Sequence, residues 1–569
     1  MSFTPTLQQM GIIEDVGLND VYKIEAGAGA AKTSTLALVA EAHIVPSLYL
    51  AFNKAMVVEA GDRFPAWVEK KTTHGVAYAV FGAGMRNKLN RPTGGYVNVC
   101  GTGSEVAKYF KIKNMFSDVG RKITANAIGQ AIRETVNSFE YSADSEITSK
   151  HVSYSALTKL SKHDGFDRQG YVNTVLSNAQ FLWKLRTNLK SQILATHDTY
   201  LKLYQLSAPN LSQYEIIYLD EGQDTNDCVL DIFRRQQHHG VKLVIVGDRR
   251  QQIYSFRGSV NAMAKLPWPQ GRLTTSFRFG QAIADLANIV LGNTGEECLK
   301  GWDQLNTEVF SPMDYANQEL PEKTTRLYRT NAALLFDAVS LIAQGKKVNL
   351  EIDVKEFLRL IDSAVALKEG NIAKVKHESL LPYDSWEDLA EEKPTGEIGR
   401  VMSIVDSGQH FEVIGVLTRH TNTDNPDIIL TTAHKSKGRE WDNVVLADDF
   451  PSPFDQHGGW VGMNEMEENL IYVGLTRAKK WLMMNQTLMA IVERHKRKVD
   501  DKAESDSLVE VLLESSKQYE EGNHCSVEEL KTRLDGIGIF TRPQGEQAGY
   551  LFDQMMEDYS GPDQIKGGM

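Results

Sequence analysis

The chain has 569 residues, of which 42% are hydrophobic and 24% charged, a balance typical of globular proteins rather than disordered ones. At about 150 residues per domain, this length predicts roughly four structural units. No apolar run is long enough to span a bilayer, and the first residues lack the pattern of a secretory signal. The four cysteines, at positions 100, 228, 298 and 525, show no paired spacing, which argues against a disulfide scaffold or a zinc ribbon. We therefore expect a soluble intracellular protein in a reducing compartment.

Charge is unevenly distributed along the chain, whose formal net charge is −12. Residues 79–191 contain 16 Lys and Arg against 8 Asp and Glu, whereas residues 500–569 contain 6 against 16. A basic segment within an acidic chain is typical of a surface that binds nucleic-acid phosphates, although a solvated helical face has the same composition. Composition alone leaves both interpretations open.

The first elements in chain order predict a phosphate-binding unit. A buried strand over residues 21–25 leads into a glycine-rich turn and a helix over 33–39, and a second strand follows at 47–52. Two further apolar runs, at 215–220 and 242–248, each end in a carboxylate. Active groups at the carboxyl ends of parallel strands are typical of open α/β sheets, so we expect an α/β fold.

The order of these elements indicates two α/β domains, each interrupted by an insertion. The basic stretch is helix-like and too long for a loop, and a second α/β region begins near Leu273. That region resumes through strands expected at 411–417, 428–432 and 443–446. The expected boundaries are 1–78 with 192–272 for the first α/β domain, 79–191 for its basic helical insertion, 273–331 with 411–499 for the second α/β domain, 332–410 for its short helical insertion, and 500–569 for an acidic C-terminal tail.

The loop from Ala26 to Thr33 has the register of a nucleotide-binding P-loop. In such a loop, backbone N–H groups surround the phosphates, the Lys32 ammonium reaches the β- and γ-phosphates, and the Thr33 hydroxyl binds Mg²⁺. Ala31 stands where glycine is usual, because the backbone approaches the phosphates closely there. The candidate ATP-binding residues of this segment are Ala26, Gly27, Ala28, Gly29, Ala30, Ala31, Lys32, Thr33 and Ser34.

Two carboxylates at the end of the third apolar run complement this loop. Asp220 suits a water-mediated contact with Mg²⁺, and Glu221 can polarise an attacking water. An acidic strand end is often only a helix N-cap, but its combination with the P-loop favours a nucleotide site.

Further segments resemble motifs of the UvrD/Rep-type superfamily 1 helicases and occur in the order of that family, from about residue 6 to 482. Residues 247–258 resemble motif III, 273–279 motif IV, 328–331 the short element after it, 432–441 motif V and 472–479 motif VI. Segments at 51–55, 72–78, 196–202 and 469–473 resemble the helicase region of F-box DNA helicases and their prokaryotic and phage relatives. The chain before residue 6 is too short for an F-box, so ubiquitin-ligase assembly is not expected.

This resemblance implies two RecA-like domains with ATP between them. Arg278 and Arg477 would reach the γ-phosphate from the second domain, and Gln251 would link that phosphate to DNA. Phe277 would stack on adenine, Gln9, rather than Gln8, would read the adenine edge, and Glu440 would contact the ribose. The expected catalytic residues are Lys32, Glu221, Gln251, Arg278 and Arg477, the expected metal ligands are Thr33 and Asp220, and the expected cofactors are ATP and Mg²⁺.

The resemblance also implies a path for single-stranded DNA across both domains. Phe52, Tyr254 and Phe256 occupy positions that stack on successive bases, a contact that tolerates any sequence. The other candidate DNA contacts are Asn53, Thr73, His74, Arg257 and His434. A lone Phe or His in an apolar stretch is more often part of the core, but the motif context favours the DNA role.

These features predict an ATP-dependent DNA helicase that moves 3′ to 5′ on single-stranded DNA and unwinds duplex, in replication, recombination or repair. Expected partners are single-stranded DNA and single/double-strand junctions, with no membrane, and the acidic tail is a candidate docking segment for a protein. The expected location is the cytoplasm of a prokaryotic or phage-infected cell, in association with the nucleoid. Two alternatives stay open: a translocase that strips recombination filaments with little unwinding, and an ATP-gated DNA-binding protein whose hydrolysis is impaired by Ala31.

Overall fold

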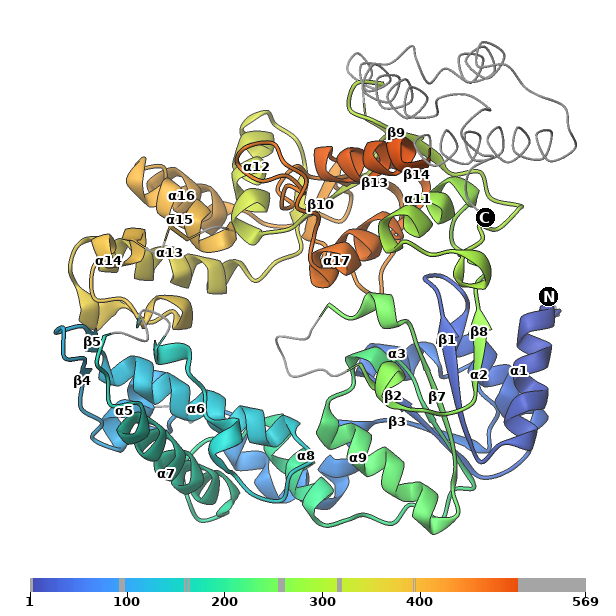
Figure 1. Ribbon diagram of the computed structural model, residues 1–569, viewed down its shortest axis with the longest axis horizontal. Coiled ribbons are helices and arrows are strands. Elements are labelled where there is room, and N and C mark those ends of the chain that lie inside the picture. Colours follow the sequence, from blue (N-terminus) through green and yellow to red (C-terminus); the bar gives the residue numbers. More distant parts are fainter. Residues whose placement is uncertain are drawn as a thin grey trace, which may run out of the picture. The chain divides into compact units, whose positions relative to one another are not determined.

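The computed structural model describes residues 4–91, 98–157, 160, 164–253, 261–314, 320–391, 393–394 and 396–499. Met1–Leu488 form one compact unit, whose described residues contain two six-stranded parallel sheets. Figure 1 draws the strands of these sheets as arrows. The expected α/β class with parallel sheets is confirmed. The acidic tail expected over 500–569 lies outside the described residues.

The first sheet has the strand order β3-β2-β6-β7-β1-β8, with parallel neighbours throughout. Its strands are β1 (Val21–Ala26), β2 (Ser47–Ala51), β3 (Val68–Thr72), β6 (Ile216–Leu219), β7 (Lys242–Gly247) and β8 (Gln270–Leu273). The helices of this half are α1 (Leu7–Leu18), α2 (Lys32–Ala42), α3 (Lys54–Glu59), α4 (Thr73–Ala77), α8 (His197–Leu206), α9 (Asp227–Arg235) and α10 (Ala262–Lys265). Because the strands are parallel, their carboxyl ends meet at one edge of the sheet.

Apolar cores lie on both faces of this sheet. Along β6, Tyr218 lies in a cluster with Leu36 of α2, whereas Leu219 lies in a second cluster with Phe233 of α9. Successive side chains of a strand point to opposite faces, so a strand that is buried on both sides reads as a continuous apolar run. This is why the strands at β6 and β7 could be predicted.

Between α4 and α8 the chain contains a group of helices with a core of its own. It contains α5 (Gly103–Tyr109), α6 (Ala125–Tyr141) and α7 (Arg168–Thr187), with a short hairpin of β4 (Met115–Phe116) and β5 (Lys122–Ile123). A buried ion pair of 3.1 Å joins Glu140 of α6 to Arg186 of α7. Glu140 also accepts a hydrogen bond of 2.6 Å from the Thr199 hydroxyl of α8, so the insertion is tied to the helices of the first sheet.

The second sheet has the strand order β11-β12-β10-β13-β14-β9. Its strands are β9 (Glu308–Phe310), β10 (Thr324–Tyr328), β11 (Val348–Leu350), β12 (Ile428–Thr432), β13 (Trp441–Leu446) and β14 (Ala478–Met483). The helices that follow β8 in the chain include α11 (Gln281–Leu291), α12 (Asn331–Ala343), α13 (Val354–Lys368), α14 (Trp386–Glu391), α15 (Gly396–Asp406), α16 (His410–Arg419) and α17 (Glu465–Leu475). Strand β11 pairs with β12, so part of the stretch 332–410 belongs to this sheet and not to a purely helical insertion.

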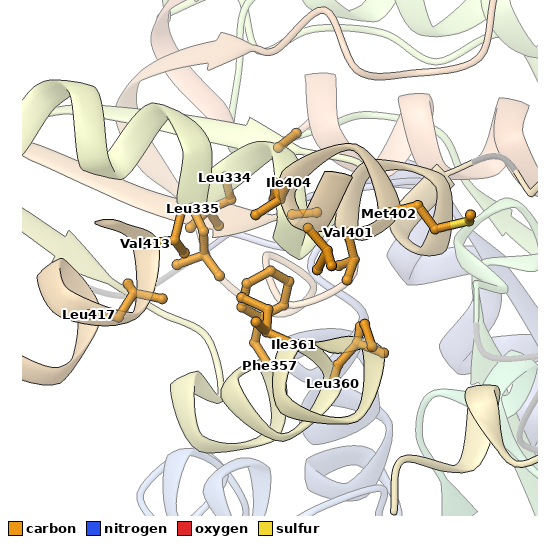
Figure 2. Close-up of a cluster of buried hydrophobic side chains, with 14 of the residues drawn as sticks. Leu334, Leu335, Phe357, Leu360, Ile361, Val401, Met402, Ile404, Val413 and Leu417 are labelled. Carbon is orange, nitrogen blue, oxygen red and sulfur yellow. The ribbon is translucent and has the colours of Figure 1, made fainter. Parts of the chain in front are cut away.

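The strand expected at 411–417 is wrong, because these residues form α16. Val413 and Leu417 are four residues apart, so a helix places them on one face, and both are buried in a cluster with Phe357 of α13. Figure 2 shows Val413, Leu417 and Phe357 in this cluster. Phe411 is 76% exposed, which fits the helical period and not a buried strand.

Candidate active site

The candidate phosphate loop joins β1 to α2. Gly29 and Ala31 both have left-handed backbone conformations, with φ of 73° and 57°. A β-carbon at Gly29 would lie 2.4 Å from Ser276 Oγ, so this position requires glycine. Ala31 adopts the same backbone region with a β-carbon, at a cost of about 1–2 kcal/mol. The buried alanines of the loop are Ala26, Ala28 and Ala30, and Ser34 lies in the first turn of α2.

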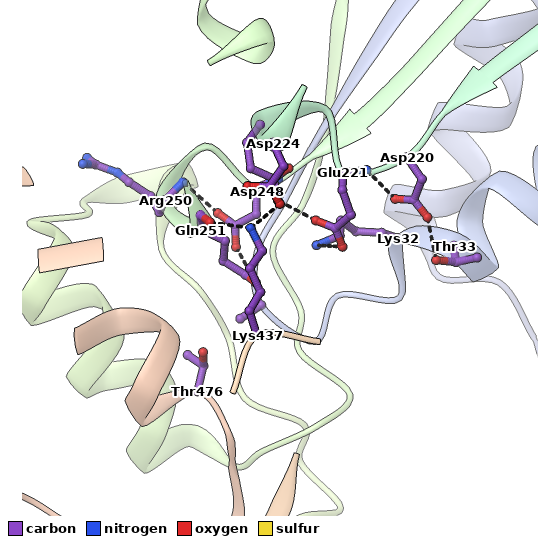
Figure 3. Close-up of polar contacts among 12 residues, drawn as sticks. Lys32, Thr33, Asp220, Glu221, Asp224, Asp248, Arg250, Gln251, Lys437 and Thr476 are labelled. Carbon is purple, nitrogen blue, oxygen red and sulfur yellow. Dashed lines mark hydrogen bonds and ion pairs between the residues drawn. The ribbon is translucent and has the colours of Figure 1, made fainter. Parts of the chain in front are cut away.

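Lys32, the first residue of α2, faces the carboxylates that follow β6 (Figure 3). Its Nζ lies 3.2 Å from Glu221 Oε1. The Thr33 hydroxyl donates to Asp220 Oδ2 at 2.8 Å, and the same oxygen accepts from the Tyr49 hydroxyl at 2.8 Å. The structure therefore brings together the candidate phosphate-binding lysine, the two candidate metal ligands and the candidate base.

Burial and neighbouring charges set the protonation of this cluster. Burial acts to raise the pKa of Glu221, but Lys32 and Lys437 outweigh it and lower that pKa to about 2. Burial and the Glu221 charge raise the pKa of Asp220, and burial raises the pKa of Asp248. Burial acts to lower the pKa of Lys32, but the surrounding carboxylates raise it. Glu221 and Lys32 thus form a charged pair at neutral pH.

A chain of hydrogen bonds leads from Glu221 to the segment after β7. The Gln223 side chain donates to Glu221 Oε2 at 2.5 Å and accepts from the Asp248 amide at 3.0 Å. The Gln251 side chain donates to Asp248 Oδ2 at 2.7 Å. Gln251, the candidate link between phosphate and DNA, is thereby connected to the candidate base.

Lys437, from the segment after β12, reaches the residues of the first half. It forms an ion pair with Asp224 and donates to the Gln251 carbonyl at 2.6 Å (Figure 3). Burial raises the pKa of Asp224 to about 6, although Lys437 acts to lower it. The sequence motifs contain both residues, but nothing in their spacing indicates that these two side chains meet.

The two candidate arginines are held differently. Arg278 donates to Glu440 Oε2 at 2.7 Å and to the Thr476 carbonyl at 3.2 Å. It lies against the phosphate loop, since a β-carbon at Gly29 would come 2.8 Å from the Arg278 Cβ. Arg477 is 1% exposed and donates to two backbone carbonyls of the second half at 2.8 and 3.2 Å. Burial and the Arg278 charge lower the pKa of Arg477 to about 9, and its contact with a γ-phosphate stays a prediction.

The two candidate adenine contacts, Gln9 and Phe277, are held by protein partners. Gln9 is buried, caps α1 with its side-chain carbonyl, and donates to the Thr35 hydroxyl at 2.9 Å. The Phe277 amide donates to the Gly29 carbonyl at 2.9 Å, and the Phe277 ring lies 4.7 Å from the Trp302 ring between centroids. The structure therefore places Phe277 at the loop but gives the Gln9 side chain two protein partners.

The candidate DNA contacts of the first half follow β2 and β3. Phe52 is 47% exposed directly after β2, and the Asn53 side chain caps α3. On α4, Thr73 is buried, and His74 Nε2 lies 3.1 Å from Asp198 Oδ1. Of the remaining candidates, His434 is half-buried after β12, and Tyr254, Phe256 and Arg257 lie outside the described residues.

The residues present fit ATP and Mg²⁺. Thr33 and Asp220 offer oxygen ligands of the kind that Mg²⁺ prefers. Within the described part of the chain, Asp224 Oδ1 is buried without a hydrogen-bond partner, which leaves an acceptor for a metal-bound water. When bound, Mg²⁺ neutralises charge on the phosphates.

Two family domains match this chain. Residues 8–265 match the UvrD/REP helicase N-terminal domain, and residues 392–488 match the UvrD-like helicase C-terminal domain. The chain belongs to the UvrD-like helicases. The resemblance found in its motifs is confirmed, and the two parallel sheets are the RecA-like units of this family.

Two relatives match this UvrD-like chain over most of its length. F-box DNA helicase protein 1 of Schizosaccharomyces pombe is 32% identical over 527 residues, which cover 85% of this chain and 57% of the relative. F-box DNA helicase 1 of Gallus gallus is 30% identical over 524 residues, which cover 84% and 49%. ATP-dependent DNA helicase PcrA of Leuconostoc citreum is 31% identical over 114 residues, 19% of this chain and 15% of the relative. The chain spans about half the length of the two F-box relatives.

These relatives correct the expected location. We expected a cytoplasmic, nucleoid-associated protein of a prokaryotic or phage-infected cell, but the two relatives that match most of the UvrD-like chain come from eukaryotes. The motifs could not reveal this, because they report the chemistry of the site and not the cell that contains it. In the described part of the chain, no helix is both long and apolar enough to cross a membrane.

Proposed function

We propose that this chain is an ATP-dependent DNA helicase that moves 3′ to 5′ on single-stranded DNA and separates duplex, with single/double-strand junctions as substrates. The observation that carries the proposal is the pairing of Lys32 with Glu221, beside the contact of Thr33 with Asp220. The second half adds Arg278 and Lys437 to the same place. Membership of the UvrD-like family supports DNA as the substrate and ATP hydrolysis as the source of free energy.

The charged pair suggests how ATP binding prepares hydrolysis. Lys32 pairs with Glu221 in this structure, and the phosphates of ATP compete for its ammonium group. Once Lys32 turns to the phosphates, Glu221 loses one of the charges that hold its pKa at about 2. A carboxylate with a higher pKa is a better proton acceptor, so the base is strengthened when nucleotide is present. Arg278 then neutralises phosphate charge from the second half.

DNA is proposed to cross the carboxyl edge of the first sheet beside this site. The exposed Phe52 offers a stacking surface, worth about 1–3 kcal/mol for one base. The basic insertion over 79–191 is proposed to hold duplex ahead of the junction, since its excess of Lys and Arg complements phosphates. Replication, recombination and repair are the proposed settings.

The proposal is tested by ATPase and strand-separation assays on the same protein preparation. We expect single-stranded DNA to stimulate ATP turnover, and a duplex with a 3′ single-stranded tail to be separated faster than blunt or 5′-tailed duplex. Lys32→Ala provides the inactive control. Preference for the 5′ tail would contradict the polarity, and absence of DNA-stimulated turnover would contradict the helicase assignment. Displacement of protein from single strands without separation of any duplex would favour the filament-stripping translocase.

A further inference from the structure

Tyr472 of α17 makes a contact between the halves to which the proposed function gives no role. Its side chain is buried, with 1% exposed. The hydroxyl accepts a hydrogen bond of 2.8 Å from the Ala28 amide of the phosphate loop and donates one of 2.9 Å to Asp248 Oδ2. One phenol oxygen of the second half thus holds two segments of the first half.

Asp248 connects Tyr472 to other residues of the candidate site. The oxygen that accepts from Tyr472 also accepts from the Gln251 side chain, and the Asp248 amide donates to Gln223, which donates to Glu221. Asp248 is buried, and a buried carboxylate that loses a donor is costly, so the positions of its partners are coupled. Movement of α17 therefore alters the hydrogen bond that holds the Gln251 side chain to Asp248.

We infer that Tyr472 is a positioning residue that transmits the position of α17 to the phosphate loop and, through Asp248, to Gln251. This inference rests on the proposed function, because it concerns how DNA-stimulated ATP turnover depends on contact between the halves. In this role Tyr472 acts through the phosphate loop and Asp248, and not by chemistry on the reacting atoms. It holds the loop and the Asp248 network in one arrangement when the halves are together.

A cavity beside Tyr472 allows the positioning role to be tested separately from a role in the stability of the fold. The cavity has a volume of about 150 Å³, and its lining includes Tyr472, Gly27 and Asp248. This volume admits water, and Asp248, which lines the cavity, is a polar partner for one. In Tyr472→Phe, a water in this cavity can donate to the Asp248 carboxylate in place of the lost hydroxyl, while the link to α17 is cut. We therefore expect the variant to fold normally.

The test compares Tyr472→Phe with Tyr171→Phe, a matched control in the insertion. Tyr171 is also buried and donates a hydrogen bond of 2.7 Å to the Ser153 carbonyl, but it lies in the insertion core. We expect Tyr472→Phe to lower kcat for DNA-stimulated ATP turnover about tenfold, which corresponds to about 1.4 kcal/mol. The KM for ATP and the thermal midpoint should change no more than in Tyr171→Phe, whose kcat stays within about twofold of the unaltered chain.

A double-mutant cycle with Gln251→Ala identifies the route. If Tyr472 acts through Asp248 on Gln251, adding Tyr472→Phe to Gln251→Ala lowers kcat no further. If the two substitutions instead lower kcat independently, so that their effects multiply, the route from Tyr472 through Asp248 to Gln251 is overturned. A kcat for Tyr472→Phe equal to that of the unaltered chain would overturn the positioning role of Tyr472. Lack of DNA-stimulated turnover in the unaltered chain would overturn the proposed function itself, a result distinct from both.

Discussion

The two halves of the molecule bring opposite charges to the same site. The carboxyl edge of the first sheet gathers buried carboxylates, namely Asp220, Asp224 and Asp248, beside Glu221. The second half contributes cationic side chains, namely Arg278, Lys437 and the buried Arg477. A buried charge without a partner is strongly unfavourable, so the acidic edge depends on cations from elsewhere. The site is therefore completed by contact between the halves, which makes it sensitive to their movement.

Removing the cation that the first half supplies itself should have the largest effect. In Lys32→Ala, Glu221 loses its 3.2 Å partner and the phosphates lose their principal charge contact. We expect ATP turnover to fall at least about a hundredfold, whereas binding of single-stranded DNA stays measurable, because the proposed DNA contacts are other residues. ATP hydrolysis and fluorescence anisotropy with a labelled strand measure the two properties.

Lys23→Ala is the control for this variant, because Lys23 is also on the first sheet but donates to backbone carbonyls. It should retain most of the turnover. Loss of DNA binding together with turnover in a folded Lys32→Ala protein would show that the two sites are not separate.

Neutralising one carboxylate of the acidic edge should have the next largest effect. Glu221→Gln keeps the shape of the side chain but cannot take a proton from water, so turnover should fall by about 10²–10⁴-fold. ATP should still bind, since Lys32 is released from its ion pair. Single-turnover hydrolysis and nucleotide binding separate these effects, and a near-normal rate would remove Glu221 from the chemistry.

A contact between the halves can be examined through pH. Burial raises the pKa of Asp224 to about 6, above its ordinary 3.8, so the folded chain holds this proton more tightly than the unfolded chain. The contribution of Asp224 to the free energy of unfolding is therefore greatest below pH 3.8 and falls as the pH rises toward 6. Asp224→Asn stays neutral and should lack this fall. Between pH 3.8 and 6, the free energy of unfolding of the unaltered chain should therefore fall relative to that of Asp224→Asn by at most about 3 kcal/mol. Thermal midpoints of both proteins, measured across this pH range, report the difference.

Parallel pH profiles for the two proteins would show that Asp224 is ionised throughout in the folded chain. That result would mean that Lys437 compensates its burial fully, and the charge contrast between the halves would be stronger than the structure indicates.

The sequence predicted local parts of this site well, because each depends on a short segment. The apolar runs before Asp220 and Asp248 are strands β6 and β7, and the loop before Lys32 joins a strand to a helix. The strand predicted at 411–417 is wrong, because a short apolar segment fits both a strand and a helix. Only the burial of Val413 and Leu417 decides between them.

Contacts between the halves could not be predicted in the same way. Tyr472 and Lys437 lie in segments recognised from the sequence, but their partners Ala28 and Asp224 are hundreds of positions away. Periodicity and spacing report neighbours within a few residues. Which side chain of a motif crosses to the other half depends on how the two sheets are packed together.

The smallest expected effect belongs to Ala31, where backbone geometry rather than charge is at issue. Ala31 has a φ of 57°, a region that glycine occupies without strain. Ala31→Gly should relieve about 1 kcal/mol in the phosphate loop, which is a factor of about five in an equilibrium constant. We therefore expect the KM for ATP to change by at most about fivefold and kcat to stay within about tenfold.

The charged groups of both halves are unaltered in this variant, so a small change would show that they, and not the loop residue, dominate the site. Turnover in Ala31→Gly but none in the unaltered chain would reverse that conclusion, because a single β-carbon would then outweigh the whole charge arrangement and the chain would be an ATP-gated DNA-binding protein.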